Sequence, residues 1–203
     1  MDPIEARAQA KRSYPKVVLK PENVAGAVVL PTREALLELL PKNGIAAEIG
    51  VAFGDFTAEI LRRNQPAKLH LIDLWGSERY SPGFVKITTT FEAQIESGQV
   101  EINRGMSIDV LASMPGEYFD WIYIDTDHSY KTTARELRIG AEKVKKNGRI
   151  LGHDFTTGNV ITPVPYGVIE ACHEFCRDCG WRYEYLTLEP HGHFSFGLVR
   201  IES

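Results

Sequence analysis

The sequence lacks a hydrophobic run of about 20 residues, the length that a transmembrane helix needs. Its first residues, MDPIEARAQAKRSYPK, also lack the apolar core of a secretory signal peptide. Cysteine is scarce, with three among 203 residues. An odd number of cysteines argues against a secreted disulfide framework. We therefore expect a cytoplasmic protein that has no membrane partner.

A basic excess is missing as well, because 23 Lys and Arg residues face 27 Asp and Glu residues and leave a net charge of −4. Binding to a phosphate backbone usually requires a basic excess or a basic patch. The densest basic run is Lys143, Lys145 and Lys146, at the predicted end of a helix, where cations offset the helix dipole. We therefore expect a small-molecule partner and no nucleic acid. The composition is compatible with a homo-oligomer and does not predict one.

Short apolar runs alternate with helical patterns from residue 45 onward. Strands are predicted at residues 45–50, 68–75, 100–105, 119–125 and 149–155. Helices are predicted between them at residues 55–64, 84–97, 107–114 and 130–146. Such alternation predicts βαβ units, a mainly parallel sheet and helices on both of its faces. The length suits one domain with a sizeable core.

The two ends of the chain follow other patterns. Prolines 15, 21 and 31 interrupt the first residues, so residues 1–43 are predicted to form a helical and irregular extension. Within it, helices are predicted at 2–12 and 32–40, and residues 13–31 are predicted to be irregular. Near the other end, a helix at 165–180 precedes strands at 181–188 and 193–201. The short link between these strands predicts an antiparallel hairpin.

The stretch EIGVAFGDFT, residues 48–57, follows the first predicted strand and has the spacing E-x-G-x-x-x-G. In open α/β sheets, ligands bind at such a turn. The dinucleotide fingerprint G-x-G-x-x-G is missing, and Asp55 places negative charge where a pyrophosphate would lie. No G-K-[ST] follows, which excludes a P-loop. A ligand with ribose and adenine but no phosphate fits this turn better.

Glu48, Gly50, Gly54 and the later stretch DTDHSY, residues 125–130, resemble the class I S-adenosylmethionine-dependent methyltransferases. The resemblance is to a small bacterial branch with the motifs EIGxxxGxF[ST] and DxDHSY, and it covers about residues 44–200. It implies a Rossmann-like, doubly wound α/β fold with a mainly parallel seven-stranded sheet and an antiparallel C-terminal hairpin. It also implies that residues 44–203 form a methyltransferase domain that uses S-adenosylmethionine as its cofactor.

The resemblance further implies a cofactor site at the strand ends. Asp73 would accept hydrogen bonds from the ribose hydroxyls, and Asp125 would lie beside the methionine part of the cofactor. Ala52 stands where the family usually has a glycine. The full predicted cofactor set is Glu48, Gly50, Ala52, Phe53, Gly54, Asp55, Phe56, Asp73, Leu74, Trp75, Gly105, Met106, Ser107 and Asp125.

His128 and Asp125 are the predicted catalytic residues. Transfer of a methyl group to a hydroxyl requires removal of its proton, and an imidazole titrates near neutrality. We therefore predict that His128 is a general base and that the small-molecule acceptor is methylated at oxygen. The alternative is that Asp127 or Ser129 caps the next helix and that His128 only packs beside it.

A divalent cation is a further hypothesis. Some related O-methyltransferases hold one between the acid that ends the fourth strand and an acidic pair that ends the fifth. The matching residues here are Asp125, His153 and Asp154. A histidine in the pair shifts the preference from magnesium toward a transition metal.

Several features support other interpretations. Cys172, Cys176 and Cys179 have a spacing known from iron–sulfur enzymes, but they share one face of a predicted helix, which favours a core role. The Gly- and Pro-containing segment at 156–167 is predicted to form a lid or acceptor wall, whereas His191 and His193 are predicted to be turn residues.

The competing functions are an NAD-dependent oxidoreductase and a non-catalytic S-adenosylmethionine-binding protein.

Overall fold

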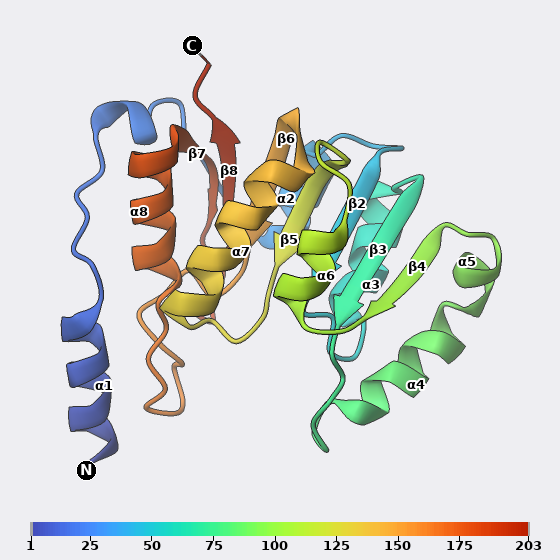
Figure 1. Ribbon diagram of the computed structural model, residues 1–203, viewed down its shortest axis with the longest axis horizontal. Helices are drawn as coiled ribbons and strands as arrows, with labels where there is room; N and C mark the ends of the chain where they lie inside the picture. The colour runs from blue at the N-terminus through green and yellow to red at the C-terminus, as the bar shows by residue number, and fades with distance from the viewer. Residues whose placement is uncertain (1, 203) are drawn as a thin grey trace.

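An eight-stranded sheet forms the centre of the computed structural model, which describes residues 2–202 (Figure 1). The strand order is β1-β7-β8-β6-β5-β2-β3-β4, and β8 is antiparallel to both of its neighbours while the other pairs are parallel. The strands are β1 Val28–Leu30, β2 Ile45–Ile49, β3 Lys68–Asp73, β4 Val100–Arg104, β5 Phe119–Ile124, β6 Val144–Gly152, β7 Trp181–Thr187 and β8 Phe196–Arg200.

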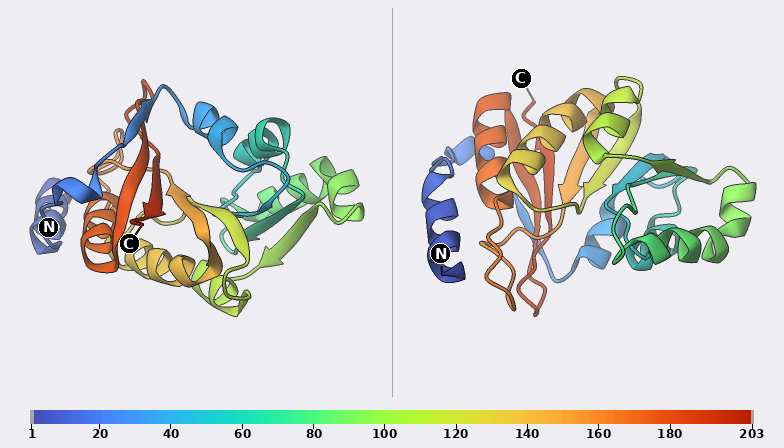
Figure 2. Two further views of the ribbon diagram at one scale, coloured as in Figure 1. Left: turned by 90° about the horizontal axis from the view of Figure 1, so that it is seen from above. Right: turned by 60° about the horizontal axis from the view of Figure 1, so that its bottom comes forward.

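Helices cover both faces of the sheet (Figure 2). Helices α6, α7 and α8 lie side by side on one face, and α2 and α3 lie on the other, with α4 and α5 beside the β4 edge. The helices are α1 Pro3–Ser13, α2 Arg33–Leu39, α3 Asp55–Glu59, α4 Ser81–Thr90, α5 Glu92–Glu96, α6 Ser107–Ser113, α7 Tyr130–Lys143 and α8 Val168–Cys179. A 3₁₀ turn (Pro21–Asn23) precedes β1, and a π-helical turn (Ile60–Asn64) continues α3.

The predicted fold class is confirmed, whereas the predicted number of seven strands is wrong. The additional strand is β1, which lies within residues predicted to be irregular and pairs with β7 in parallel, Val28 opposite Tyr185. A strand of three residues is too short to show the alternation of apolar and polar residues that predicts a strand. Its pairing partner lies near the other end of the chain, so only the tertiary structure reveals the strand.

The alternation of side chains along β5 divides the core between the two faces. Ile122 and Ile124 face α7 and α8, whereas Trp121 and Tyr123 face α2 and α3. Cys172 and Cys176 are fully buried on the α8 side, which confirms the core interpretation for these two residues, and Cys179 is exposed.

Several predicted boundaries are wrong: β6 begins at Val144 and not at 149, and the helix predicted at 84–97 begins at Ser81 and is divided into α4 and α5. Helix α7 ends at Lys143, so Lys145 and Lys146 belong to β6, where Val144 pairs with Phe119 and is buried. The link between β7 and β8 spans residues 188–195 and is longer than predicted, because it folds back toward the carboxyl ends of the parallel strands.

The N-terminal residues pack against the rest of the molecule through buried side chains and hydrogen bonds. Leu36 and Leu37 of α2 are fully buried, and the Asn23 side chain donates hydrogen bonds to the carbonyl oxygens of Cys176 and Trp181. Helix α1 has no buried residue, and Lys11 Nζ donates to the Tyr166 carbonyl at 3.0 Å. None of the helices within residues 2–202 has the length and apolar character needed to cross a membrane.

Candidate functional site

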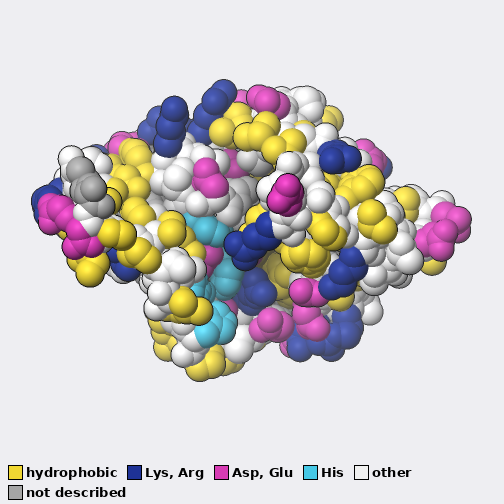
Figure 3. Space-filling model, turned by 90° about the horizontal axis from the view of Figure 1, so that it is seen from below, with side chains coloured by type: hydrophobic (Ala, Val, Ile, Leu, Met, Phe, Trp, Pro, Cys, Tyr) yellow, Lys and Arg dark blue, Asp and Glu magenta, His cyan; other side chains and the backbone are white. Residues whose placement is uncertain are grey.

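A cleft of about 900 Å³ opens at the carboxyl ends of β2, β3, β4, β5 and β6. Histidine side chains gather in a hollow on this face, beside lysine and arginine side chains (Figure 3). The topology explains the position of the cleft, because the strand order reverses between β2 and β5 and ligands bind at such a switch point.

The loop after β2 has a left-handed backbone at three alternate residues, with φ of +89° at Gly50, +50° at Ala52 and +78° at Gly54. A Cβ atom at Gly50 would lie 2.0 Å from the Asp125 carbonyl oxygen, and one at Gly54 would lie 2.9 Å from the Phe91 ring. Both glycines are therefore required by the protein's own packing. Ala52 adopts a conformation that favours glycine.

Asp73 anchors this loop. Its Oδ2 accepts hydrogen bonds from the backbone N–H groups of Val51 at 2.8 Å and Ala52 at 2.9 Å, and its Oδ1 accepts from Trp75 at 2.8 Å. A carboxylate offers about four acceptor positions. Three are occupied by the protein, so about one faces the cleft and remains for a ligand hydroxyl.

The predicted cofactor residues line the cleft, with the exception of Gly54 and Trp75. Trp75 is buried behind the loop, and its Nε1 donates to the Ala52 carbonyl at 2.8 Å. Leu74 and Met106 expose 46% and 53% of their surface and form apolar walls that suit a planar ring.

Two acids lie deeper in the cleft. Glu48 is buried, and its Oε2 accepts a hydrogen bond from the Thr57 hydroxyl at 2.5 Å. Burial raises the pKa of Glu48 to about 8. Burial also raises the pKa of Asp125 to about 7, an effect to which the nearby Asp154 charge adds and which Arg33 opposes. Both carboxyls therefore hold a proton more firmly than an exposed acid does.

His128 and Asp154 bring together the loops after β5 and β6. His128 Nε2 lies 3.0 Å from Asp154 Oδ2, and the other oxygen of Asp154 is bound to His193 Nδ1. Because an ionised carboxylate only accepts hydrogen bonds, Nε2 of a neutral His128 carries the proton. Nδ1 is then free to accept one, at 4.0 Å from Asp125 Oδ1. Burial lowers the pKa of His128 and favours this neutral form.

The helix cap that was predicted as the alternative role for this segment is formed by the two residues beside His128. Ser129 is the N-cap of α7, and its Oγ accepts from the Thr132 N–H at 3.2 Å. Asp127 in turn accepts hydrogen bonds from the Ser129 N–H and the Thr132 hydroxyl. His128 itself has a φ of +58° and its ring lies in the cleft, so capping and a place in the site are compatible.

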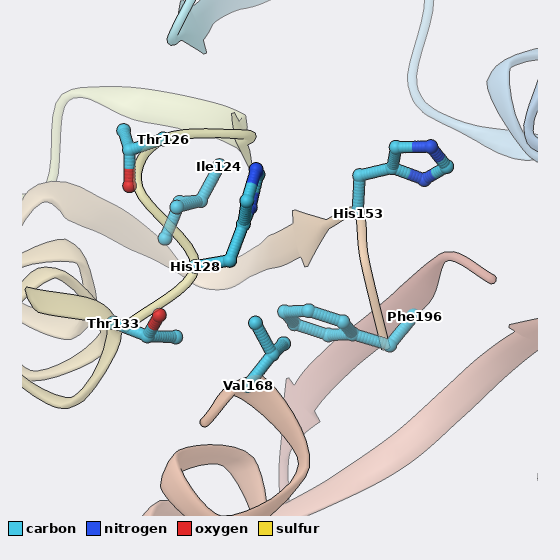
Figure 4. Close-up of a pocket in the computed structure, with 7 residues that line it drawn as sticks. All are labelled: Ile124, Thr126, His128, Thr133, His153, Val168 and Phe196. Carbon is cyan, nitrogen blue, oxygen red and sulfur yellow. The ribbon is translucent and has the colours of Figure 1, made fainter. Parts of the chain in front are cut away.

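His153 does not join the other predicted metal ligands. The mutually close ligand atoms, within 4.8 Å of one another, belong to Asp125, His128 and Asp154. His153 Nδ1 instead lies 3.0 Å from Ser195 Oγ, and burial lowers its pKa to about 3. Both histidines line a small cavity of about 10 Å³. Figure 4 shows the His153 ring directed away from the other labelled side chains.

The partners of these acids do not fit a divalent cation. Both oxygens of Asp154 already accept from imidazoles, and the guanidinium of Arg33 lies 3.7 Å from Asp125 Oδ2. A divalent ion at this place would compete with the imidazoles of His128 and His193 for the oxygens of Asp154, and the guanidinium would repel it. The charged groups that meet here are therefore the protein's own acids, imidazoles and guanidinium.

Several residues of the site could not be predicted from the sequence. Arg33 begins α2 in the N-terminal extension, and nothing in its local spacing indicates a ligand. His191 and His193 do lie in the β7–β8 link, as predicted, but this link also brings His193 to Asp154, which was not predicted. The segment at 156–167 does border the cleft, through Asn159, Thr162, Val164 and Tyr166.

Comparison with known proteins identifies the family. A family model described as a methyltransferase domain matches residues 47–155, which is more than half of the chain. No curated protein matches the sequence. Among solved structures, one from Corynebacterium glutamicum is 14% identical with a TM-score of 0.63, and the alignment covers 100% of this chain and 92% of that chain.

Two other similar structures belong to proteins whose descriptions name a function. An O-methyltransferase family protein from Burkholderia thailandensis is 13% identical with a TM-score of 0.60, over 84% of this chain and 56% of that chain. The pyocyanin biosynthetic protein PhzM is 14% identical with a TM-score of 0.58, over 83% and 54%. The chain thus spans about half the length of these two proteins, and such low identities show the fold alone. On the family match, the chain belongs to the methyltransferase domain family.

Proposed function

We propose that this protein transfers the methyl group of S-adenosylmethionine to a hydroxyl oxygen of a small molecule. The observation that carries the proposal is the His128–Asp154 pair, which lies in the same cleft as the Glu48–Gly54 loop. A volume of about 900 Å³ is at the upper end of the range for ligand pockets, so the cleft has room for cofactor and acceptor together.

The residues of the cleft suit an adenosyl ligand at one end. Asp73 offers an acceptor for a ribose hydroxyl, and Leu74 and Met106 offer apolar surface for the adenine ring. When bound, the cofactor would supply an electrophilic methyl group on a sulfonium. Asp55 at the start of α3 places negative charge where a pyrophosphate would lie, which argues against the NAD-dependent oxidoreductase.

The other end of the cleft suits proton removal from an acceptor. His128 Nδ1 would accept the hydroxyl proton of the acceptor, and the oxygen would then be the nucleophile for the methyl group that the bound cofactor would supply. Asp154 fixes the orientation of the imidazole through Nε2 and stabilises the imidazolium that forms. General base catalysis of this kind contributes about 10²- to 10⁴-fold in rate.

Two further observations support a small acceptor that is methylated at an oxygen atom. One similar structure is described as an O-methyltransferase family protein. The net charge of −4 favours a small acceptor over a nucleic acid.

Calorimetric titration with S-adenosylhomocysteine, with NAD as the control ligand, tests the cofactor class. We expect micromolar binding of the first and none of the second. A screen of phenols and hydroxy acids with labelled S-adenosylmethionine then tests transfer. Binding of NAD alone would support the oxidoreductase, and binding of S-adenosylhomocysteine without transfer to any hydroxyl would support a non-catalytic binding protein.

A further inference from the structure

Arg33 places a guanidinium group in the cleft from outside the predicted domain. It is the first residue of α2, and its side chain is 25% exposed. The guanidinium carbon lies 4.3 Å from the centre of the Phe56 ring, and Nη1 lies 3.7 Å from Asp125 Oδ2. An arginine from the N-terminal segment thus stands between the first loop and the end of β5.

The position of Arg33 is fixed by contacts that do not use its charge. Thr32 caps α2, with its Oγ1 accepting from the Ala35 N–H at 3.3 Å. The Arg33 N–H donates to Oε1 of the buried Glu189 at 2.8 Å. A carboxylate at this helix N-terminus is also favoured by the helix dipole. Because these contacts hold the backbone, the side chain can be replaced without removing the anchor of the helix.

The guanidinium interacts with the Tyr123 side chain, but the acids around it do not accept hydrogen bonds from its donors. Within residues 2–202, its closest carboxylate oxygens belong to Glu34 and Asp125, each at 3.7 Å, which is beyond hydrogen-bond range. Arginine carries five N–H donors in a planar fork that matches a carboxylate or phosphate. A cation held in a cleft in this way is complementary to an anionic ligand group.

The acids beside Arg33 indicate what kind of anion is expected. Asp125 and Glu48 line the same part of the cleft, and their carboxyl oxygens accept hydrogen bonds, so this part of the cleft suits an ammonium group better than a phosphate. A cation next to acids is the arrangement that a free α-amino acid group requires, because that group carries one charge of each sign.

We propose that Arg33 binds the α-carboxylate at the amino-acid end of the cofactor, with Asp125 accepting from the adjacent ammonium. This assignment rests on the proposed use of S-adenosylmethionine. It makes the N-terminal segment part of the cofactor site. The guanidinium, and no metal ion, is then the cation that faces Asp125 at the end of β5.

Three ligands with the same adenosine part separate the contacts. S-adenosylhomocysteine has the whole amino-acid end, its decarboxylated analogue lacks only the carboxylate, and 5′-methylthioadenosine lacks both charged groups. Calorimetry would compare the wild type with Arg33→Ala and Arg33→Lys. Arg62→Ala is the matched control, since Arg62 is exposed and pairs with Glu59 on the surface.

We expect Arg33→Ala to weaken S-adenosylhomocysteine binding about 10- to 100-fold, the loss of a charge-assisted hydrogen bond. Arg33→Lys should recover part of this loss, because lysine keeps the charge and loses the planar fork. Binding of the decarboxylated analogue and of 5′-methylthioadenosine should change less than about 3-fold, and Arg62→Ala should change none of the three.

Each other outcome has a definite meaning. An equal loss for all three ligands in Arg33→Ala would show a structural role and overturn the assignment. Unchanged S-adenosylhomocysteine binding would also overturn it and would direct Arg33 toward the acceptor. If the wild type bound none of the three ligands, the proposed cofactor would be wrong, a failure distinct from that of Arg33.

Discussion

His128 Nε2 lies 3.0 Å from Asp154 Oδ2, and both residues have a left-handed backbone, with φ of +58° and +56°. Residues other than glycine adopt this conformation at a cost of about 1–3 kcal/mol each, and such strain is concentrated at functional sites. Here it turns the loops after β5 and β6 so that an imidazole and a carboxylate meet above the strand ends. The chemistry proposed for the cleft depends on this contact.

Replacing the imidazole should affect transfer and leave cofactor binding intact. We expect His128→Ala to lower the turnover of an identified hydroxyl acceptor by about 10²- to 10⁴-fold, with S-adenosylhomocysteine affinity changed less than about 3-fold. His173→Asn, on α8 and outside the cleft lining, is the matched control and should keep its activity. Full turnover of His128→Ala would remove His128 from the catalytic role.

The titration of His128 should depend on Asp154. Burial lowers the pKa of His128 below the ordinary histidine value, and the charge of Asp154 partly opposes that shift by stabilising the imidazolium. Asp154→Asn should therefore lower the pKa of His128 further. NMR titration of the imidazole signals measures this, with His70 as the internal control, since burial lowers its pKa at a place away from Asp154. A higher pKa of His128 in Asp154→Asn would contradict the arrangement.

Ala52→Gly should stabilise the protein. The left-handed conformation at Ala52 costs an L-residue about 1–2 kcal/mol, and the greater freedom of glycine in the unfolded chain returns part of that. We expect a net gain of about 0.5–1 kcal/mol and a rise of about 2 °C in Tm. Ala58→Gly, in the exposed part of α3, should instead lose about 1 kcal/mol. Calorimetric melting of both variants gives the comparison, and a lower Tm for Ala52→Gly would be the contrary result.

Glu48→Gln should change how stability depends on pH. The pKa of Glu48 is raised from 4.5 to about 8 by burial, so between these values the folded state holds a proton that the unfolded state has lost. The contribution of Glu48 to stability therefore falls as pH rises through this window. The variant removes that term and should gain stability over the wild type from pH 5 to pH 8, on the order of 2–4 kcal/mol.

Denaturant unfolding at pH 5 and pH 8 checks this difference. The exposed Glu96→Gln is the control and should track the wild type at both pH values. A Glu48→Gln variant that is equally displaced from the wild type at both pH values would mean that Glu48 does not titrate in this window.

Much of the fold could be predicted because its signals are local. The apolar runs that become β2 to β6 and the amphipathic segments between them are visible within windows of a few residues. Gly50 and Gly54 are also local signals, although the reason for them lies elsewhere, since a side chain at Gly50 would meet the Asp125 carbonyl. The sequence predicted that a glycine is needed there and could not predict what approaches it.

By itself, the sequence determined the α/β class, the family motifs and the strand ends that carry Glu48, Asp73, Asp125 and Asp154. Only the tertiary structure decided the contacts among loops: His128 with Asp154, His193 with the same carboxylate, and Arg33 with Asp125. The strand order sets which loops meet, and a contact between distant segments leaves no periodicity in either one. The side-chain partners in the cleft therefore depend on how the sheet is assembled, whereas the strands themselves can be predicted from short stretches of the sequence.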